Sequence, residues 1–136
     1  ENIQNQLNDV AGIRVVCAFI DDIYTIADLI TRQDDITVIQ VKDYIKNPKP
    51  NGYRSFHMIL DVPVYMSNGK EIAPVEIQIR TIAMDFWASL EHQLHYKSTG
   101  DPKIAASLTG ELKECSETIS GIDQKMQDMF KKINLL

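Results

Sequence analysis

Segments with strand character and segments with helix character alternate along this chain, and their order restricts the fold more than any other feature of the sequence. β-Branched and aromatic residues indicate strands, and apolar residues that recur every three or four positions indicate helices. We predict strands over residues 13–19, 36–44, 55–65 and 72–80. We predict helices over 22–32, 82–96 and from 103 to 136, and residues 2–8 resemble the end of a further helix. With 136 residues, the chain is expected to form one domain in which helices flank a sheet.

Turn and capping residues mark the ends of these elements. Asp21 and Asp22 offer an N-cap and a first-turn acid to the helix over 22–32. Residues 67–70, Ser-Asn-Gly-Lys, predict a hairpin turn, and residues 100–102, Gly-Asp-Pro, interrupt the chain before the final helix. We expect the apolar stripe of the helix over 82–96 to belong to the core; it consists of Ala83, Phe86, Trp87, Leu90 and Leu94.

The predicted fourth strand separates polar from apolar side chains with the two-residue period of a strand. One of its faces carries Glu76, Gln78 and Arg80, and the other carries valine and isoleucine. In the same way, His57 lies opposite the apolar residues of the third strand, and Arg14 lies opposite those of the first strand. This pattern fits the floor of a binding cleft, but it also fits a solvated outer face of an antiparallel sheet.

A second acid, Asp9, stands just before the first strand. Together with Glu76 it would place two carboxylates at strand ends. Such a pair suits Mg²⁺, which prefers oxygen ligands and keeps positions open for water and phosphate. Pairs of acids are also common where no metal binds, so the residues alone leave both interpretations open.

Residues 42–57 concentrate positive charge in a chain whose net charge is −5. They contain Lys42, Lys46, Lys49 and Arg54 together with turn residues and one aromatic ring, Tyr53. Cations bind phosphates and a flat ring stacks on a base, so the segment suits a nucleotide. The alternative is a solvated hairpin loop. The acidic balance of the rest of the chain argues against a broad nucleic-acid surface, so RNA is a conceivable partner that the sequence does not indicate.

Composition places the chain among ordinary globular proteins, with 44% apolar and 24% charged residues. It contains no apolar run long enough for a membrane span and begins with no secretory leader. Cys17 and Cys115 fall in a predicted strand and on the apolar stripe of a predicted helix. We interpret both as reduced core residues of a cytoplasmic protein.

Four motifs occur in one order and at one spacing: Asp9-Val-Ala-Gly-Ile-Arg14, the segment 42–57, Val75-Glu76-Ile-Gln-Ile-Arg-Thr81 and Glu91-His92…His95-Tyr96-Lys97. In these motifs the chain closely resembles the synthetase domain of the RelA/SpoT family, the GTP pyrophosphokinases that make the alarmone (p)ppGpp. Since no hydrolase or regulatory sequence accompanies the motifs, the chain resembles a small, single-domain alarmone synthetase. The resemblance implies an α+β fold, a nucleotidyltransferase-like mixed sheet flanked by helices with a long C-terminal helix.

The resemblance also implies residue roles. Glu76 would be the catalytic base for the 3′-hydroxyl of GDP or GTP and, with Asp9, a ligand of Mg²⁺. Tyr53 would stack on guanine, and Arg14 would face ATP. The other residues that would hold the acceptor nucleotide are Lys42, Lys49, Asn51, His57 and Gln78. His92 and His95 have no further ligand spaced to complete a zinc site, and we interpret them as surface or structural residues of their helix.

One feature departs from the family pattern. Family members carry a basic helix and loop before the first strand that grip the phosphates of ATP, whereas residues 1–8 contain no lysine or arginine. We therefore expect the chain to lack part of its donor site. Two functions follow: a synthetase that makes ppGpp or pppGpp and AMP, or a guanine-nucleotide or RNA-binding module without turnover.

The final helix carries an uninterrupted heptad pattern. Apolar residues recur in a 4-3-4-3 rhythm, as in the seam of a coiled coil. The alternative is an amphipathic helix packed on its own domain, and Gly121 weakens a long coil. Because small synthetases of this family are oligomeric, we expect a homo-oligomer, a tetramer, that involves residues 103–136. The seam consists of Leu108, Leu112, Cys115, Ile119, Ile122, Met126, Met129, Ile133 and Leu136.

Overall fold

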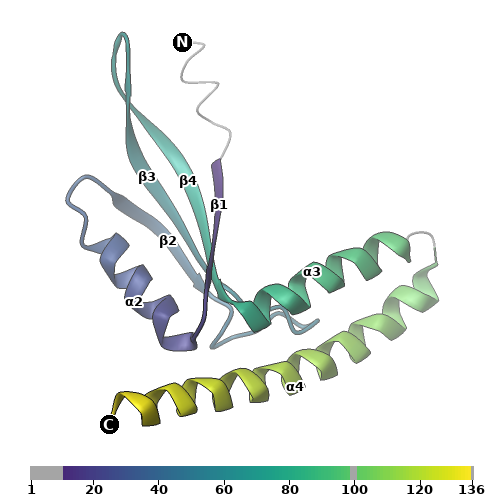
Figure 1. Ribbon diagram of the computed structural model, residues 1–136. Coiled ribbons are helices and arrows are strands. Elements are labelled where there is room, and N and C mark those ends of the chain that lie inside the picture. The colour runs from purple at the N-terminus through teal and green to yellow at the C-terminus, as the bar shows by residue number, and fades with distance from the viewer. Residues whose placement is uncertain (1–10, 99–100, 136) are drawn as a thin grey trace.

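The computed structural model describes residues 11–98 and 101–135. These residues form a mixed sheet of four strands, β1 (Ala11–Cys17), β2 (Thr37–Asp43), β3 (Phe56–Met66) and β4 (Gly69–Thr81). The strand order is β1-β4-β3-β2; β1 runs parallel to β4, and the other neighbours are antiparallel. Three helices accompany this sheet: α2 (Ile20–Thr31), α3 (Ile82–Lys97) and α4 (Pro102–Asn134) (Figure 1). The predicted α+β class, mixed sheet and long C-terminal helix are confirmed.

Most element boundaries lie close to those predicted. One helix starts earlier than predicted: α2 begins at Ile20 rather than at residue 22, and Phe19 takes the N-cap position. Asp22 accepts a hydrogen bond from the Phe19 backbone N–H (3.2 Å), so this acid serves the first turn from inside the helix. The β3–β4 hairpin is longer than predicted and closes between Met66 and Gly69. The helix end predicted at residues 2–8 lies outside the described residues.

Helix α2 packs against one face of the sheet and forms the core with it. Ile23 and Ala27 of α2 are buried, because they share the helix face that meets the apolar side of the strands. The sheet contributes its own buried apolar residues from three strands: Cys17, Phe56, Met58, Leu60, Ile77 and Ile79. Glu76 and Gln78 alternate with Ile77 and Ile79, so they point away from α2.

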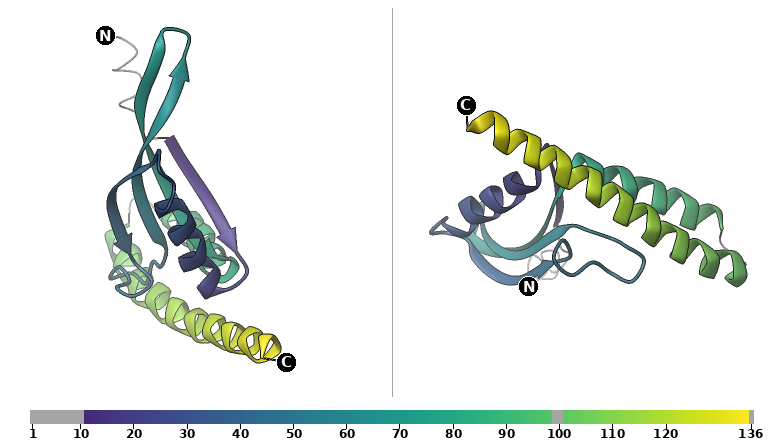
Figure 2. Two further views of the ribbon diagram at one scale, coloured as in Figure 1. Left: turned by 90° about the vertical axis from the view of Figure 1, so that its left-hand side faces the viewer. Right: turned by 90° about the horizontal axis from the view of Figure 1, so that it is seen from below.

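Helices α3 and α4 lie side by side at the end of the sheet where β4 finishes (Figure 2). Thr81, the last residue of β4, caps α3 by accepting a hydrogen bond from the Met84 backbone N–H (3.2 Å). Asp101 caps α4 in the same way, with Pro102 in the first turn, as the predicted chain break requires. The indole of Trp87 donates to the Leu112 carbonyl (2.9 Å) and joins the two helices.

The apolar stripe predicted to be core on α3 is only partly buried. Trp87 is buried, whereas Phe86, Leu90 and Leu94 are exposed. Cys17 is buried and Cys115 is exposed, and both are free, so the core assignment is confirmed for Cys17 and wrong for Cys115. Helical periodicity identifies an apolar face, but it does not say whether the chain itself covers that face.

The heptad seam of α4 docks on the domain in its first half at most, where Leu108, Leu112 and Ile119 are partly buried. The buried residues of α4 are polar, namely Ser116, Asp123 and Gln127. The second half of the seam is exposed; its described members there are Ile122, Met126, Met129 and Ile133.

None of the helices in the described part of the chain combines the length and hydropathy that a membrane crossing requires.

Candidate active site

A row of polar side chains crosses all four strands on the sheet face opposite α2. The register pairs Arg14 of β1 with Gln78 of β4, Gln78 with His57 of β3, and His57 with Lys42 of β2. Neighbours in such a row have Cβ atoms about 4.5–5.5 Å apart, within reach of each other and of one ligand. Residues that are far apart in the sequence therefore share one surface.

Glu76 lies on the same face, one step along β4 from Gln78. Its partners on the adjoining strands are Gly12 and Ile59, neither of which carries a polar side chain. The carboxylate contacts Gln78, whose Nε2 donates to Oε1 at 3.4 Å, and His57, whose Nδ1 is 3.9 Å from Oε2. About a third of the Glu76 side chain is exposed, at 35%, which leaves it accessible to a ligand.

The loop of residues 44–55 folds over one end of this row and presents Tyr53. Its turn is closed by the Gly52 N–H, which donates to the Lys49 carbonyl (2.8 Å). Gly52 has a φ of 98°, a left-handed conformation that favours glycine. The Asn51 side chain accepts from the Tyr53 N–H (3.0 Å), so Asn51 shapes the turn that carries the ring.

The Tyr53 ring lies among other aromatic and cationic groups. It meets His57 edge-on, with ring centroids 5.6 Å apart, and Tyr44 with centroids 6.0 Å apart. The Lys49 ammonium lies 5.1 Å from the centre of the Tyr53 ring and 5.0 Å from that of Tyr44. Lys49 is therefore held beside the ring by cation–π attraction.

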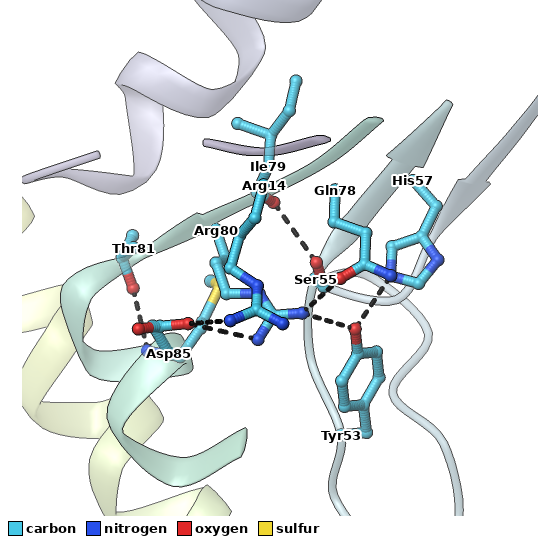
Figure 3. Close-up of polar contacts among 10 residues, drawn as sticks. Arg14, Tyr53, Ser55, His57, Gln78, Ile79, Arg80, Thr81 and Asp85 are labelled. Carbon is cyan, nitrogen blue, oxygen red and sulfur yellow. Dashed lines mark hydrogen bonds and ion pairs between the residues drawn. The ribbon is translucent and has the colours of Figure 1, made fainter. Parts of the chain in front are cut away.

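Arg80 lies between Asp85 on one side and Tyr53 and Gln78 on the other (Figure 3). Its side chain is buried, with the residue 3% exposed, and its guanidinium donates to the Tyr53 hydroxyl (2.9 Å) and to Gln78 Oε1 (2.7 Å). A third contact reaches Asp85 Oδ1 at 3.3 Å, and Arg14 lies 3.7 Å from the same oxygen. A buried guanidinium needs such partners to offset its desolvation, so Arg80 fixes Tyr53 and Gln78 relative to α3.

His57 is poised as a neutral imidazole. Burial lowers its pKa, and the positive charges of Arg80, Lys49 and Lys42 act in the same direction, while Glu76 opposes them. The Tyr53 hydroxyl accepts from Arg80 and is 2.9 Å from His57 Nε2. These partners assign the proton of the neutral ring to Nδ1, the nitrogen that faces Glu76.

A cleft of about 450 Å³ opens between this site and α3. Arg14, Tyr53 and Arg80 line one side of it. The other side comes from the middle of α3 and consists of Ala88, Ser89, Glu91, His92 and Gln93. His92, interpreted from the sequence as a surface residue, thus borders the cleft.

Of the two predicted metal ligands, Glu76 is on the polar face and Asp9 lies outside the described residues. Within residues 11–98 and 101–135, no group of three or more histidine, cysteine or acidic side chains gathers as a metal site. The exposed carboxylate of Glu76 is a hard oxygen donor, which fits Mg²⁺ in chemical type.

The structure brings together most of the residues that the sequence singled out. Arg14, Lys42, His57 and Gln78 form the row, Glu76 lies beside it, and the 44–55 loop adds Lys49, Asn51 and Tyr53. Two contributors, Asp85 and Tyr44, were not singled out, and Arg80 was placed on the polar face but given no role in the site. Arg80 shares the two-residue period of Glu76 and Gln78, and that signal places it on the polar face; no local pattern marks Tyr44 or Asp85.

Comparison with known proteins relates this site to one family. The family model described as "Region found in RelA / SpoT proteins" matches residues 1–101. The GTP pyrophosphokinase YwaC of Bacillus subtilis is 46% identical over 98% of this chain, and YjbM of the same organism is 39% identical over 90% of it. The chain spans 63% and 57% of the lengths of these two relatives.

Solved structures show the same fold. Small alarmone synthetase 2 from Bacillus subtilis matches 89% of this chain and 65% of its own with a TM-score of 0.83 and 50% identity. Small alarmone synthetase 1 from that organism, bound to its product pppGpp, matches 90% of this chain and 62% of its own with a TM-score of 0.81 and 37% identity. The same synthetase bound to AMPCPP matches 90% of this chain and 60% of its own with a TM-score of 0.69 and 31% identity.

Proposed function

The chain belongs to the RelA/SpoT family, and from this premise we propose that it transfers pyrophosphate from ATP to the 3′-hydroxyl of GDP or GTP. The products are AMP and the alarmone ppGpp or pppGpp. The single observation that carries the proposal is the polar row from Arg14 to Lys42, with Glu76 on the same face and Tyr53 at its end. Relatives named as GTP pyrophosphokinases, and a similar synthetase bound to pppGpp, support it.

The guanine nucleotide occupies the side of the row nearer the 44–55 loop in this proposal. Tyr53 stacks on the base, because its ring is half-buried and held in place by its hydroxyl. Lys42 and Lys49 neutralise the phosphates of the nucleotide. His57 and Gln78 hold the ribose, and Asn51 keeps the loop in the shape that presents Tyr53.

The reaction is a displacement at the β-phosphorus of ATP. The 3′-oxygen of the acceptor forms a bond to this phosphorus, and the bond from the phosphorus to the α,β-bridging oxygen breaks, so AMP leaves. Glu76 takes the proton of the 3′-hydroxyl, because a carboxylate oxygen can act as a general base and Gln78 helps to orient it. Arg14 faces ATP and neutralises charge on its phosphates.

Asp9 and Glu76 would hold Mg²⁺ in this site. The ion supplies neutralisation of the negative charge on the phosphates of ATP. The chain itself places Glu76 beside the row and aims it through Gln78 and His57.

We also propose a homo-oligomer, a tetramer, in which the exposed apolar residues of α4 contact another copy of the chain. Apolar side chains in a heptad rhythm on a solvated helix face are what a helix–helix contact between subunits requires. We propose a cytoplasmic location as well, because the proposed substrates, ATP and guanine nucleotides, are found there.

The test is the dependence of AMP formation on the acceptor. The full-length protein is incubated with Mg²⁺ and ATP, with or without GDP or GTP. We expect AMP and ppGpp or pppGpp to form in equal amounts, and no AMP without the acceptor. Binding of GDP or GTP without AMP release would instead identify a guanine-nucleotide-binding module.

A further inference from the structure

Helix α4 reaches three other parts of the fold through three buried polar side chains. Ser116 contacts the 44–55 loop, Asp123 accepts from the hydroxyl of Thr81 at the end of β4 (2.6 Å), and Gln127 accepts from the backbone N–H of Asp21 in α2 (2.7 Å). Buried polar groups are costly unless they are paired, so these contacts fix where α4 sits. Of these three hydrogen bonds, only that of Ser116 reaches the segment that carries Tyr53; Asp123 acts on this segment through the charge of Arg54 alone.

The contact between Ser116 and the loop is close. The Ser116 hydroxyl donates to the carbonyl oxygen of Gly52 at 2.5 Å. A Cβ on residue 52 would lie 2.6 Å from the Ser116 Cβ, closer than real contacts allow, and 3.1 Å from the Cα of Lys113, a tight contact. The loop backbone therefore lies directly on α4, and Gly52 is required both by this approach and by its φ of 98°.

Arg54, two residues after Gly52, is also held by α4. Arg54 donates from Nε to the Ser116 hydroxyl (3.3 Å) and from Nη1 to the hydroxyl of Ser120 (2.6 Å). Tyr53 lies between Gly52 and Arg54, so α4 anchors the chain on both sides of the ring. The third anchor is the hydrogen bond of the Tyr53 hydroxyl with Arg80.

We propose that Ser116 is a positioning residue for the acceptor nucleotide: it holds the 44–55 loop on α4 so that Tyr53 stands ready to stack on guanine. This inference rests on the proposed function and extends it to a helix outside the polar row. Ser116 touches neither nucleotide; it acts through Gly52 and Arg54.

The proposal predicts a selective kinetic effect. Ser116→Ala keeps the Cβ and a good helix former but leaves the buried Gly52 carbonyl without its donor. The loop then populates the competent conformation less often, and apparent affinity falls by that fraction. Because one lost buried hydrogen bond shifts such an equilibrium roughly 5- to 30-fold, we expect the KM for GDP or GTP to rise by that factor. The KM for ATP and the kcat at saturating acceptor should stay within about twofold, because bound nucleotide restores the loop.

Two variants on the same helix control for general loosening of α4. Gln127→Ala removes a buried polar contact of α4 that lies away from the loop, so it should lower the melting temperature and leave the acceptor KM unchanged. Thr118→Ala removes an exposed hydroxyl that bonds only within its own helix, to the Glu114 carbonyl, and should change neither. An equal rise in acceptor KM for Ser116→Ala and Gln127→Ala would overturn the positioning role.

Amide hydrogen exchange of the ligand-free protein tests the inference without turnover. We expect Ser116→Ala to speed exchange at the amides of Gly52 and Tyr53, whose hydrogen bonds close the turn, whereas Gln127→Ala should not. Unchanged exchange in Ser116→Ala would overturn the proposal. If exchange rises as expected but the parent protein forms no AMP, the proposed function fails while the positioning of the loop is supported.

Discussion

At the scale of single residues, the site depends on a chain of contacts that runs from Arg80 through the Tyr53 hydroxyl to His57 and on to Glu76. Each member is oriented by the one before it, so a ring, an imidazole and a carboxylate are preorganised without the ligand. Preorganisation of this kind favours catalysis because little reorientation remains for the reaction step.

Tyr53 should contribute to acceptor binding through its ring. We expect Tyr53→Ala to weaken GDP or GTP binding by about 1–3 kcal/mol, the range for stacking of a base on an aromatic ring. Tyr53→Phe should lose less affinity than Tyr53→Ala, because the ring is kept although its hydroxyl contacts to Arg80 and His57 are lost. Calorimetric titration measures both; equal loss in the two variants would show that the hydroxyl, and not stacking, matters.

His57 should make the stability of the protein depend on pH. Its pKa is lowered from 6.5 in the folded state, chiefly by burial, and its side chain is 12% exposed. Above about 6.5 both states are neutral, and below it the unfolded chain binds a proton more readily, so stability is lost as the pH falls through 6.5. Thermal melting between pH 7.5 and 5.5, roughly a unit on either side of that value, should show a larger decrease for the parent than for His57→Gln, and equal decreases would contradict the assignment.

The sequence identified the residues of the row because the two-residue period and the motif spacing place Arg14, His57, Glu76 and Gln78 on polar faces. It did not identify Arg80 as the group that orients Tyr53. That contact joins the end of β4 to a loop 27 positions away, and it exists only after the loop folds over the sheet. The local sequence pattern around Arg80 carries no information about its contact with Tyr53.

At the scale of elements, the buried residues of α4 are polar, while the second half of its apolar seam stays exposed. Caps and turn residues predicted the helix ends well, because capping is a local property of the sequence. The direction in which each helix face points depends on the tertiary fold, so heptad spacing alone could not separate the docking face of α4 from its solvent face.

Asp123 provides a test of how α4 docks. Burial raises the pKa of its carboxyl, although the Thr81 hydroxyl and Arg54 oppose the shift, so the charged form is disfavoured. Asp123→Asn keeps an acceptor for Thr81 without a charge and should leave stability at pH 7 equal or higher. Asp123→Ala should lower it by about 1–3 kcal/mol, the cost of a lost partner in a buried site. Chemical denaturation distinguishes them, with exposed Asp128→Ala as control; a larger loss for Asn than for Ala would contradict this docking.

At the scale of the whole molecule, the exposed seam of α4 should carry the contact between subunits. Met126→Glu places a charge in an apolar contact and should shift the proposed tetramer to smaller species, whereas Thr118→Glu, on an exposed position outside the seam, should not. Analytical ultracentrifugation reports the change. A parent protein that is monomeric at every concentration, or an unchanged mass for Met126→Glu, would show that the exposed seam does not carry a contact between subunits.

The most direct measurement of the central claim compares turnover and acceptor binding in Glu76→Gln of the full-length protein. The amide keeps the size and hydrogen-bonding shape of Glu76 but can neither accept the proton of the 3′-hydroxyl nor offer a charged oxygen to Mg²⁺. We predict that GDP or GTP binding and the melting temperature stay close to the parent values while AMP formation is lost. AMP formation within a few-fold of the parent would contradict the claim and leave Glu76 as a surface acid.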